Sequence, residues 1–241
     1  ESGEARTDLE YNDFMGMIFE EYKANRTFNQ SHAIISRTNA PLASTAMNLL
    51  KNDVDFEILG KDLSRELIDH IKKTTWHKPQ NHQIEVFPYA LSDYLNSLHG
   101  RWGDKVSKQD ELRQIEQTTE ALLSVLQHLD ELEFMHNNRR MNTALDFISY
   151  IKDKLGGLDP DNEYDSKKLK EKNPNSYITL TTTHKSKGLE WDKVFIVKPD
   201  EFDPNKPNIT SPEAAQQERN AWYVALTRAK HSINISADDE P

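Results

Sequence analysis

The sequence of 241 residues contains no cysteine, only eight glycines and no long apolar run. The absence of cysteine excludes disulfide bonds, thiolate nucleophiles and zinc or iron–sulfur sites with Cys ligands. No segment approaches the ~18 consecutive apolar residues of a membrane span, and residues 1–4 do not open a basic and then apolar leader. We therefore expect a cytoplasmic protein with no membrane partner.

Positive charge is also scarce. The chain has 30 Lys and Arg residues against 40 Asp and Glu residues, which gives a formal net charge of -10. This balance argues against a polycation that coats nucleic acid nonspecifically, although a local cationic strip can still bind phosphates within an acidic protein. The hydrophobic content of 36% is sufficient for the core of one large domain or two modest domains.

Strands alternate with helices in the two flanks of the sequence. The expected strands are 33–36, 55–59, 177–182, 193–197 and 232–236. The expected helices are one that a capping box at 7–10 opens, and those at 39–52, 63–73 and 212–228. This alternation predicts an α/β fold with a parallel sheet flanked by helices.

The middle of the sequence has a different texture. A long helix is expected at 107–136 and a shorter one at 142–157, and the segment from about residue 76 to 172 offers almost no strand. The charged segment 159–172 has the composition of a solvated linker. We therefore expect an α/β domain formed by 1–75 and 174–241, interrupted by an all-helical subdomain at 76–173.

A cationic loop follows the predicted strand at 177–182. Its polar side chains are those of Thr182, His184, Lys185, Ser186 and Lys187. At the exit of a strand, where backbone N–H groups are also available, such residues suit phosphate oxygens. Gly188 permits a close backbone approach, and Glu190 can accept a hydrogen bond from a sugar hydroxyl. The same composition also suits a solvated, lysine-rich turn.

Arg228 lies between the last predicted helix and the last predicted strand. An arginine that a rigid element holds in such a place can be aimed at a γ-phosphate. Its planar fork then neutralises the charge that develops during phosphoryl transfer. A helix-terminal arginine that interacts with the helix dipole or with a surface acid is the alternative.

Other candidate sites are weaker. Residues 194–201 imitate a Walker B strand, but Lys198-Pro199 breaks the spacing, and the sequence contains no Gly-x-x-x-x-Gly-Lys-Ser/Thr phosphate loop. The histidines have no facing spacing with a partner acid, so no metal site is predicted. Trp76, Tyr94 and Trp102 suit base stacking, but packing is the simpler expectation for aromatic residues in a small helical subdomain.

Taken together, these segments resemble the UvrD/Rep/PcrA-type superfamily 1 DNA helicases. Residues 181–196 resemble motif V, 217–230 resemble motif VI, and 33–40, with the sequence AIISRTNA, resemble the segment named motif IVa. The resemblance covers roughly 8–74 and 174–237. It implies a second RecA-like motor domain into which a helical subdomain is inserted. The chain departs from the family pattern at Thr183, Lys185 and Trp191.

The resemblance implies a role for each matching residue. Arg228 is expected to be the catalytic arginine finger at the γ-phosphate of ATP, and Glu190, near Gly188, is expected to bond the ribose of the nucleotide. Lys187 is expected to couple the DNA surface to the ATP cleft. The expected contacts to the backbone of single-stranded DNA come from Arg37, Asn39, Thr182, His184 and Lys187.

The resemblance also implies parts that this sequence lacks. The N-terminal RecA-like domain, with its phosphate loop and the ligands of Mg²⁺, is expected upstream in the same protein. The whole protein should couple ATP hydrolysis to movement along single-stranded DNA and to unwinding of the duplex, whereas the chain alone should not hydrolyse ATP. Two alternatives stay open: a non-catalytic RecA-like module that binds DNA or a protein partner, and the helicase part of a RecB-like or AddA-like helicase–nuclease.

Overall fold

The computed structural model describes residues 4–158, 163–206 and 209–237. The internal contacts divide the chain into two compact units, a sheet unit formed by residues up to Lys61 and from Gly157 onward, and a helical unit formed by Asp62–Gly156. Both boundaries lie earlier in the chain than the predicted ones after residues 75 and 173. They differ because α3 (Asp62–Thr74) packs on helices of the helical unit, whereas Lys172 forms an ion pair with Glu57 of the sheet unit.

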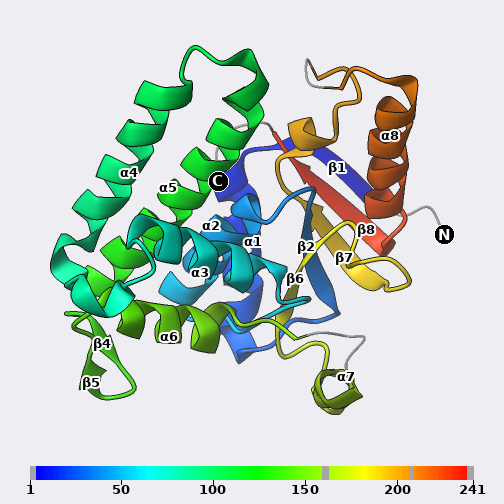
Figure 1. Ribbon diagram of the computed structural model, residues 1–241. Coiled ribbons are helices and arrows are strands. Elements are labelled where there is room, and N and C mark those ends of the chain that lie inside the picture. Colours follow the sequence, from blue (N-terminus) through cyan, green and yellow to red (C-terminus); the bar gives the residue numbers. More distant parts are fainter. Residues whose placement is uncertain (1–3, 159–162, 207–208, 238–241) are drawn as a thin grey trace. The chain divides into compact units, whose positions relative to one another are not determined.

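A six-stranded parallel sheet forms the centre of the sheet unit, in the order β1-β8-β7-β2-β6-β3 (Figure 1). The strands are β1 (Glu4–Leu9), β2 (His32–Ser36), β3 (Phe56–Ile58), β6 (Ile178–Thr182), β7 (Trp191–Ile196) and β8 (Ala229–Ser236). All five residues of β2 are buried, as expected of a central parallel strand that is covered on both faces. The predicted α/β fold with a RecA-like parallel sheet is confirmed.

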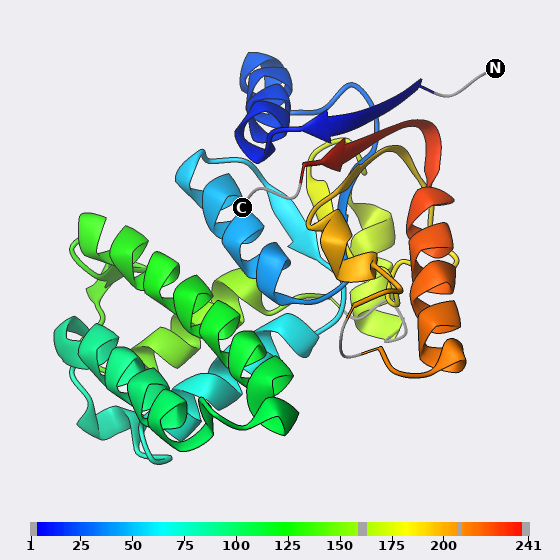
Figure 2. The same cartoon turned by 90° about the horizontal axis from the view of Figure 1, so that it is seen from above.

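Helices cover both faces of this sheet. The helices of the sheet unit are α1 (Tyr11–Asn25), α2 (Ala40–Lys51), α7 (Glu163–Glu171) and α8 (Pro212–Leu226). Figure 2 shows α1 and α2 on one side of the strands and α8 on the other. Phe14 of α1 packs on Phe195 of β7, with ring centroids 5.3 Å apart. On the opposite face, the small residues Ala221 and Ala225 let α8 lie close to the strands in one buried cluster with Val194.

Two local predictions for the sheet unit are wrong. Thr7 to Glu10 do not form a capping box, because Thr7 and Leu9 belong to β1, which pairs in parallel with β8. The edge of β8 offers backbone hydrogen bonds, and this tertiary pairing overrides the local capping signal. The helix α1 begins only at Tyr11. The charged segment predicted as a linker forms α7 instead, because its Glu, Lys and Leu residues favour helix.

The helical unit contains α3, α4 (Phe87–Trp102), α5 (Gln109–Glu131) and α6 (Ala144–Leu155). Thr143 and Asp146 form a capping box at the start of α6, which confirms the predicted helix start. The unit is not wholly helical, because β4 (Met135–His136) and β5 (Arg139–Arg140) form a short antiparallel hairpin. Its two turn residues, Asn137 and Asn138, both have positive φ angles, which asparagine tolerates in a two-residue hairpin turn.

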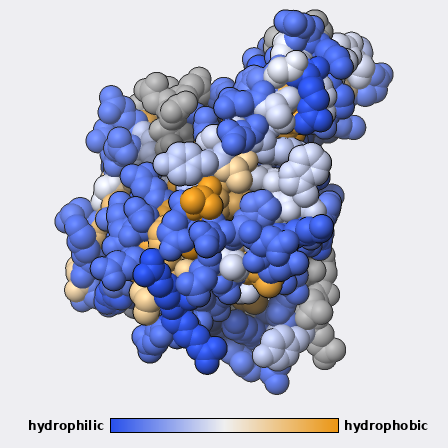
Figure 3. Space-filling model, turned by 60° about the vertical axis from the view of Figure 1, so that its left-hand side comes forward, coloured by the Kyte–Doolittle hydropathy of each residue, from blue (hydrophilic) through white to orange (hydrophobic). Residues whose placement is uncertain are grey.

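The surface is mostly polar. Figure 3 shows one face that hydrophilic residues dominate, with apolar residues gathered only in small groups. The exposed large apolar side chains are spread along the chain and include Trp76, Tyr89, Tyr164 and Tyr223. Among the residues that the structure describes, no helix is both long and apolar enough to cross a membrane.

Candidate functional site

Hydrogen bonds hold the backbone of the loop between β6 and β7 in place. Thr183 donates two hydrogen bonds to the carbonyl oxygen of Ser36, from its amide at 3.0 Å and from its hydroxyl at 3.2 Å. The hydroxyl of Ser186 donates to the carbonyl of Thr183 at 2.8 Å, and both side chains are buried. His184 and Lys187 remain exposed on this fixed backbone. These bonds do not fit a freely solvated turn.

A cavity of about 260 Å³ lies between this loop and α8. Its lining residues are Arg37, Thr183, His184, Lys187, Gln217, Asn220, Ala221 and Val224. The residues of α8 in this lining follow the spacing i, i+3, i+4, i+7, which places them on one helical face. The structure therefore brings together three of the predicted DNA-contacting residues, from segments that are far apart in the sequence.

Two other predicted DNA-contacting residues lie outside the cavity lining, and two residues of the lining were not predicted. Asn39, which precedes α2, and Thr182, which ends β6, are not among the residues that line the cavity. Gln217 and Asn220 line it and were not predicted as site residues. Their helical spacing from Ala221, which packs on the sheet, is a weak sequence signal for this position.

Arg37 is held by a carboxylate that the sequence analysis did not single out. Its Nε donates to Oε2 of Glu218 at 2.7 Å, and its Nη2 donates to Oε1 at 2.8 Å. The two side chains are only 24% and 15% exposed. The hydrogen bond from Arg37 is the main reason why the pKa of Glu218 lies below its usual value, and the same bond raises the pKa of Arg37.

A second acid lies beside this pair. The hydroxyl of Thr38 donates to Oε2 of Glu201 at 2.8 Å, and burial raises the pKa of this glutamate. Glu201 belongs to the short helix η4 (Pro199–Phe202) and is the last residue of the segment that imitates a Walker B strand. Within the described ranges, no three His, Asp or Glu side chains lie close enough together to hold a metal ion.

Arg228 lies at the end of α8, immediately before β8. Its Nη1 donates to the carbonyl of Leu189 at 2.9 Å, its Nε to the carbonyl of Val224 at 3.0 Å, and its Nη2 to the hydroxyl of Thr227 at 3.0 Å. Three of the five guanidinium N–H groups are therefore fixed by the protein, and the arginine is half-buried. In the described part of the chain, the remaining two N–H groups make no hydrogen bond and can bind an anion.

Glu190 and Gly188 lie close to this arginine. The amide of Trp191 donates to the backbone carbonyl of Arg228 at 2.9 Å, so residues on both sides of Glu190 are bonded to Arg228. Glu190 itself is exposed at the amino end of β7, and Gly188 has a φ of +84°. The predicted nucleotide-binding residues thus share one edge of the sheet, where β7 and β8 begin.

Two residues of the cavity, Arg37 and His184, lie at the opposite end of the strands from the Arg228 edge. Arg37 and His184 follow the carboxyl ends of β2 and β6, whereas Glu190 and Arg228 precede the amino ends of β7 and β8. Two continuous segments connect these places, the loop 183–190 and α8. Leu189 anchors the loop by packing against the buried cluster beneath α8.

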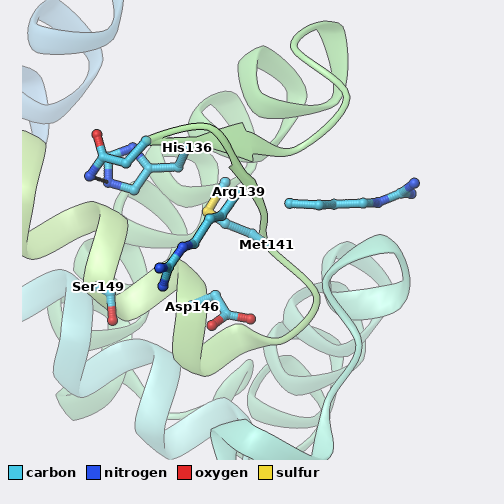
Figure 4. Close-up of a pocket in the computed structure, with 7 residues that line it drawn as sticks. His136, Arg139, Met141, Asp146 and Ser149 are labelled. Atoms are coloured by element: carbon cyan, nitrogen blue, oxygen red, sulfur yellow. Dashed lines mark hydrogen bonds between the residues drawn. The ribbon is translucent and has the colours of Figure 1, made fainter.

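A second cavity, of about 460 Å³, lies in the helical unit (Figure 4). It is lined by His136, Asn137, Arg139, Arg140, Met141, Asp146 and Ser149. Two of its basic side chains face carboxylates, since His136 lies 3.2 Å from Asp153 and Arg140 lies 3.1 Å from Glu85. The sequence motifs do not reach this cavity, so it is the weaker candidate for a functional site.

Comparison with known sequences agrees with this geometry. A profile of the UvrD-like helicase C-terminal domain matches residues 6–240, so the chain belongs to that family. A stretch of 62 residues is 37% identical to DNA helicase II of Haemophilus influenzae. That alignment covers 25% of this chain and 8% of the length of the Haemophilus protein.

Proposed function

We propose that the chain is the second motor domain of an ATP-dependent DNA helicase. Membership of the UvrD-like helicase C-terminal family supports a helicase role, and DNA helicase II of Haemophilus influenzae is a partial relative. The observation that carries the finer proposal is the position of Arg228. It is braced on Leu189 and flanks Glu190, and the loop 183–190 and α8, to which it is bonded, also line the cationic cavity.

The residues at the Arg228 edge suit a nucleoside triphosphate. Backbone carbonyls and a hydroxyl orient the guanidinium and leave two N–H groups for a phosphate oxygen. Glu190 presents an exposed carboxylate that can accept a hydrogen bond from a ribose hydroxyl. Arg228 would stabilise negative charge on the γ-phosphate, in a cleft that a first RecA-like domain completes. The phosphate loop and the Mg²⁺ ligands would belong to that other domain.

The cavity suits the backbone of single-stranded DNA. Arg37, His184 and Lys187 provide N–H donors and positive charge, and Gln217 and Asn220 provide neutral donors. Phosphate contacts fix a strand without reading its sequence, which suits a motor that must move along any sequence. A cavity of about 260 Å³ accommodates a phosphate and part of a sugar, rather than a whole strand, so neighbouring surface must carry the remaining contacts.

The two places would communicate through the loop 183–190 and α8. Movement of Arg228 towards a γ-phosphate would pull on Leu189 through their hydrogen bond, and this pull would shift Lys187 in the same loop. Closure of the cleft would thereby change the grip on the strand. Stepping along DNA requires such a coupled change.

The test compares the chain alone with the helicase that carries it. The chain should bind a single-stranded oligonucleotide with an affinity that falls steeply as salt rises, because counterions are released from phosphates. It should not hydrolyse ATP, whereas the helicase should do so at a rate that single-stranded DNA increases. ATP turnover by the pure chain would contradict the proposal, and so would the absence of any binding to the oligonucleotide.

A further inference from the structure

Glu218 occupies only one edge of the Arg37 guanidinium. An arginine has five N–H donors, and Glu218 takes two of them, on Nε and Nη2. In the described part of the chain, these are the hydrogen bonds that the guanidinium makes. The edge formed by Nη1 and the second N–H of Nη2 is left over, and Arg37 is one of the residues that line the cavity. That edge carries a second pair of donors that can bind a phosphate in a bidentate manner.

We propose that Glu218 is a positioning residue of the polynucleotide site. It holds Arg37 by the side edge, so that the opposite edge is presented to a phosphodiester in the cavity. Glu218 does not itself touch the strand. The inference rests on the proposed function, because it requires the cavity to be the place where single-stranded DNA binds.

Glu218 is well placed to hold an arginine still. It lies in α8, three and seven residues before Ala221 and Ala225, which are buried against the sheet. Arg37 follows β2 directly, and β2 is buried along its whole length. The ion pair thus joins two fixed elements across 181 positions of sequence. A side chain that is already ordered loses less rotamer freedom when it binds its ligand.

If only the negative charge of Glu218 mattered, its removal would change the affinity for DNA in the opposite direction, so the proposal can be tested directly. A carboxylate close to a phosphate site repels the phosphate, so removal of Glu218 should strengthen DNA binding if only charge matters. If Glu218 positions Arg37, removal of its charge should weaken binding instead. The direction of the change in affinity therefore separates the two roles.

The experiment measures binding of a fluorescent oligothymidylate to the chain by anisotropy, at several salt concentrations. For Glu218→Gln we expect the Kd to rise about fivefold to tenfold. The slope of log Kd against log salt should fall by about 0.7, which corresponds to the loss of one phosphate contact on a single strand. If the role of Glu218 were purely structural, the number of phosphate contacts would stay the same and the slope of log Kd against log salt would not change.

Glu213→Gln is the matched control. Glu213 lies in the first turn of the same helix, is exposed and carries the same charge. Its replacement removes one negative charge without touching Arg37, so the affinity should stay the same or rise slightly. Thermal unfolding of both variants checks that the fold is retained. Should Glu218→Gln unfold, Arg37→Lys provides the second test, since it keeps the charge but loses the two-edged fork and should weaken binding similarly.

The double variant completes the test. In an Arg37→Ala background, Glu218→Gln should cause no further weakening, because there is no arginine left to position. If Glu218→Gln binds as tightly as Glu213→Gln or more tightly, Glu218 competes with the phosphate and the inference is overturned. If the unaltered chain binds but Arg37→Ala has no effect, the inference fails while the site at His184 and Lys187 stands. If the unaltered chain does not bind, the proposed DNA site itself fails.

Discussion

Arg228 donates a hydrogen bond to the carbonyl oxygen of Leu189 at 2.9 Å and so joins the end of α8 to the loop before β7. The backbone carbonyl of the same arginine accepts a hydrogen bond from Trp191, also at 2.9 Å. These two bonds enclose Glu190. Because Arg228 is both a structural connection and the proposed catalytic group, its replacement must be judged by activity and by stability together.

Arg228→Lys should abolish most of the DNA-stimulated ATP hydrolysis of the helicase that carries this chain. Lysine keeps the positive charge but cannot reproduce a planar fork that bonds a carbonyl and a phosphate at once. We expect kcat to fall by at least about 10³-fold, as for other arginine fingers. Steady-state ATPase assays measure this value.

Arg219→Lys is the control for that experiment. Arg219 is exposed on the same helix and bonds only Gln216 in the described structure. Its replacement should leave kcat within a factor of about two, since surface changes of this kind have small effects. Equal losses for the two variants would show that Arg228 has no special role in hydrolysis.

Lys187→Ala should weaken binding of single-stranded DNA and lower the salt slope by about 0.7. Lys187 is exposed on a loop whose backbone Thr183 and Ser186 fix, so its removal should not disturb the fold. Lys167→Ala removes an exposed lysine from α7, away from the cavity lining, and should leave the slope unchanged. Fluorescence anisotropy at several salt concentrations distinguishes the two. Identical slopes for both variants would place Lys187 outside the phosphate contacts.

Gly188 and Gly157, two glycines with positive φ angles in the sheet unit, should respond differently to alanine. At Gly188, with a φ of +84°, an added Cβ meets nothing within 4 Å, so Gly188→Ala should cost about 1 kcal/mol of backbone strain. At Gly157, with a φ of +67°, the Cβ would lie 2.0 Å from the carbonyl oxygen of Gly60. Gly157→Ala should therefore lower the free energy of unfolding by at least about 3 kcal/mol. Chemical denaturation compares the variants, and equal losses would refute the clash.

The helical unit should lose stability on acidification because of His70. This histidine is buried, its Nε2 lies 3.0 Å from the hydroxyl of Thr119, and burial, with Lys73 nearby, lowers its pKa to about 4. In the unfolded chain the pKa of this histidine is about 6.5. Between about pH 6.5 and about pH 4 the unfolded chain therefore binds more protons than the folded one. Stability should thus fall as the pH drops from about 6.5 to about 4, by roughly 3 kcal/mol in total.

His70→Gln tests this pH dependence, because glutamine can still bond Thr119 but does not titrate. The variant should show a flatter dependence of its unfolding free energy over the same pH window. Urea denaturation at several pH values provides the measurement. An unchanged dependence would assign the acid sensitivity to another group.

Much of the fold follows from the sequence, because the strands of the sheet unit are short apolar runs between clear helices. The cationic loop and Arg228 were also predictable, since their residue types are unusual at the ends of a strand and a helix. The capping signal at Thr7 failed because a strand partner at β8, more than 200 positions away, decides the structure there. Glu218 was not foreseen for a similar reason, because no local pattern links an acid in α8 to Arg37 across 181 positions.

The chain leaves the sheet unit for the helical unit and returns from it at two directly adjacent segments. Leu59 and Leu158 form a parallel β-bridge, and the amide of Gly60 donates to the carbonyl of Leu158 at 2.6 Å. Because the segments that leave and re-enter the sheet unit are already hydrogen-bonded to each other, the helical unit inserted between them does not have to span a gap in the sheet. An insertion at this point can therefore differ in length or in fold while the six-stranded sheet keeps its shape.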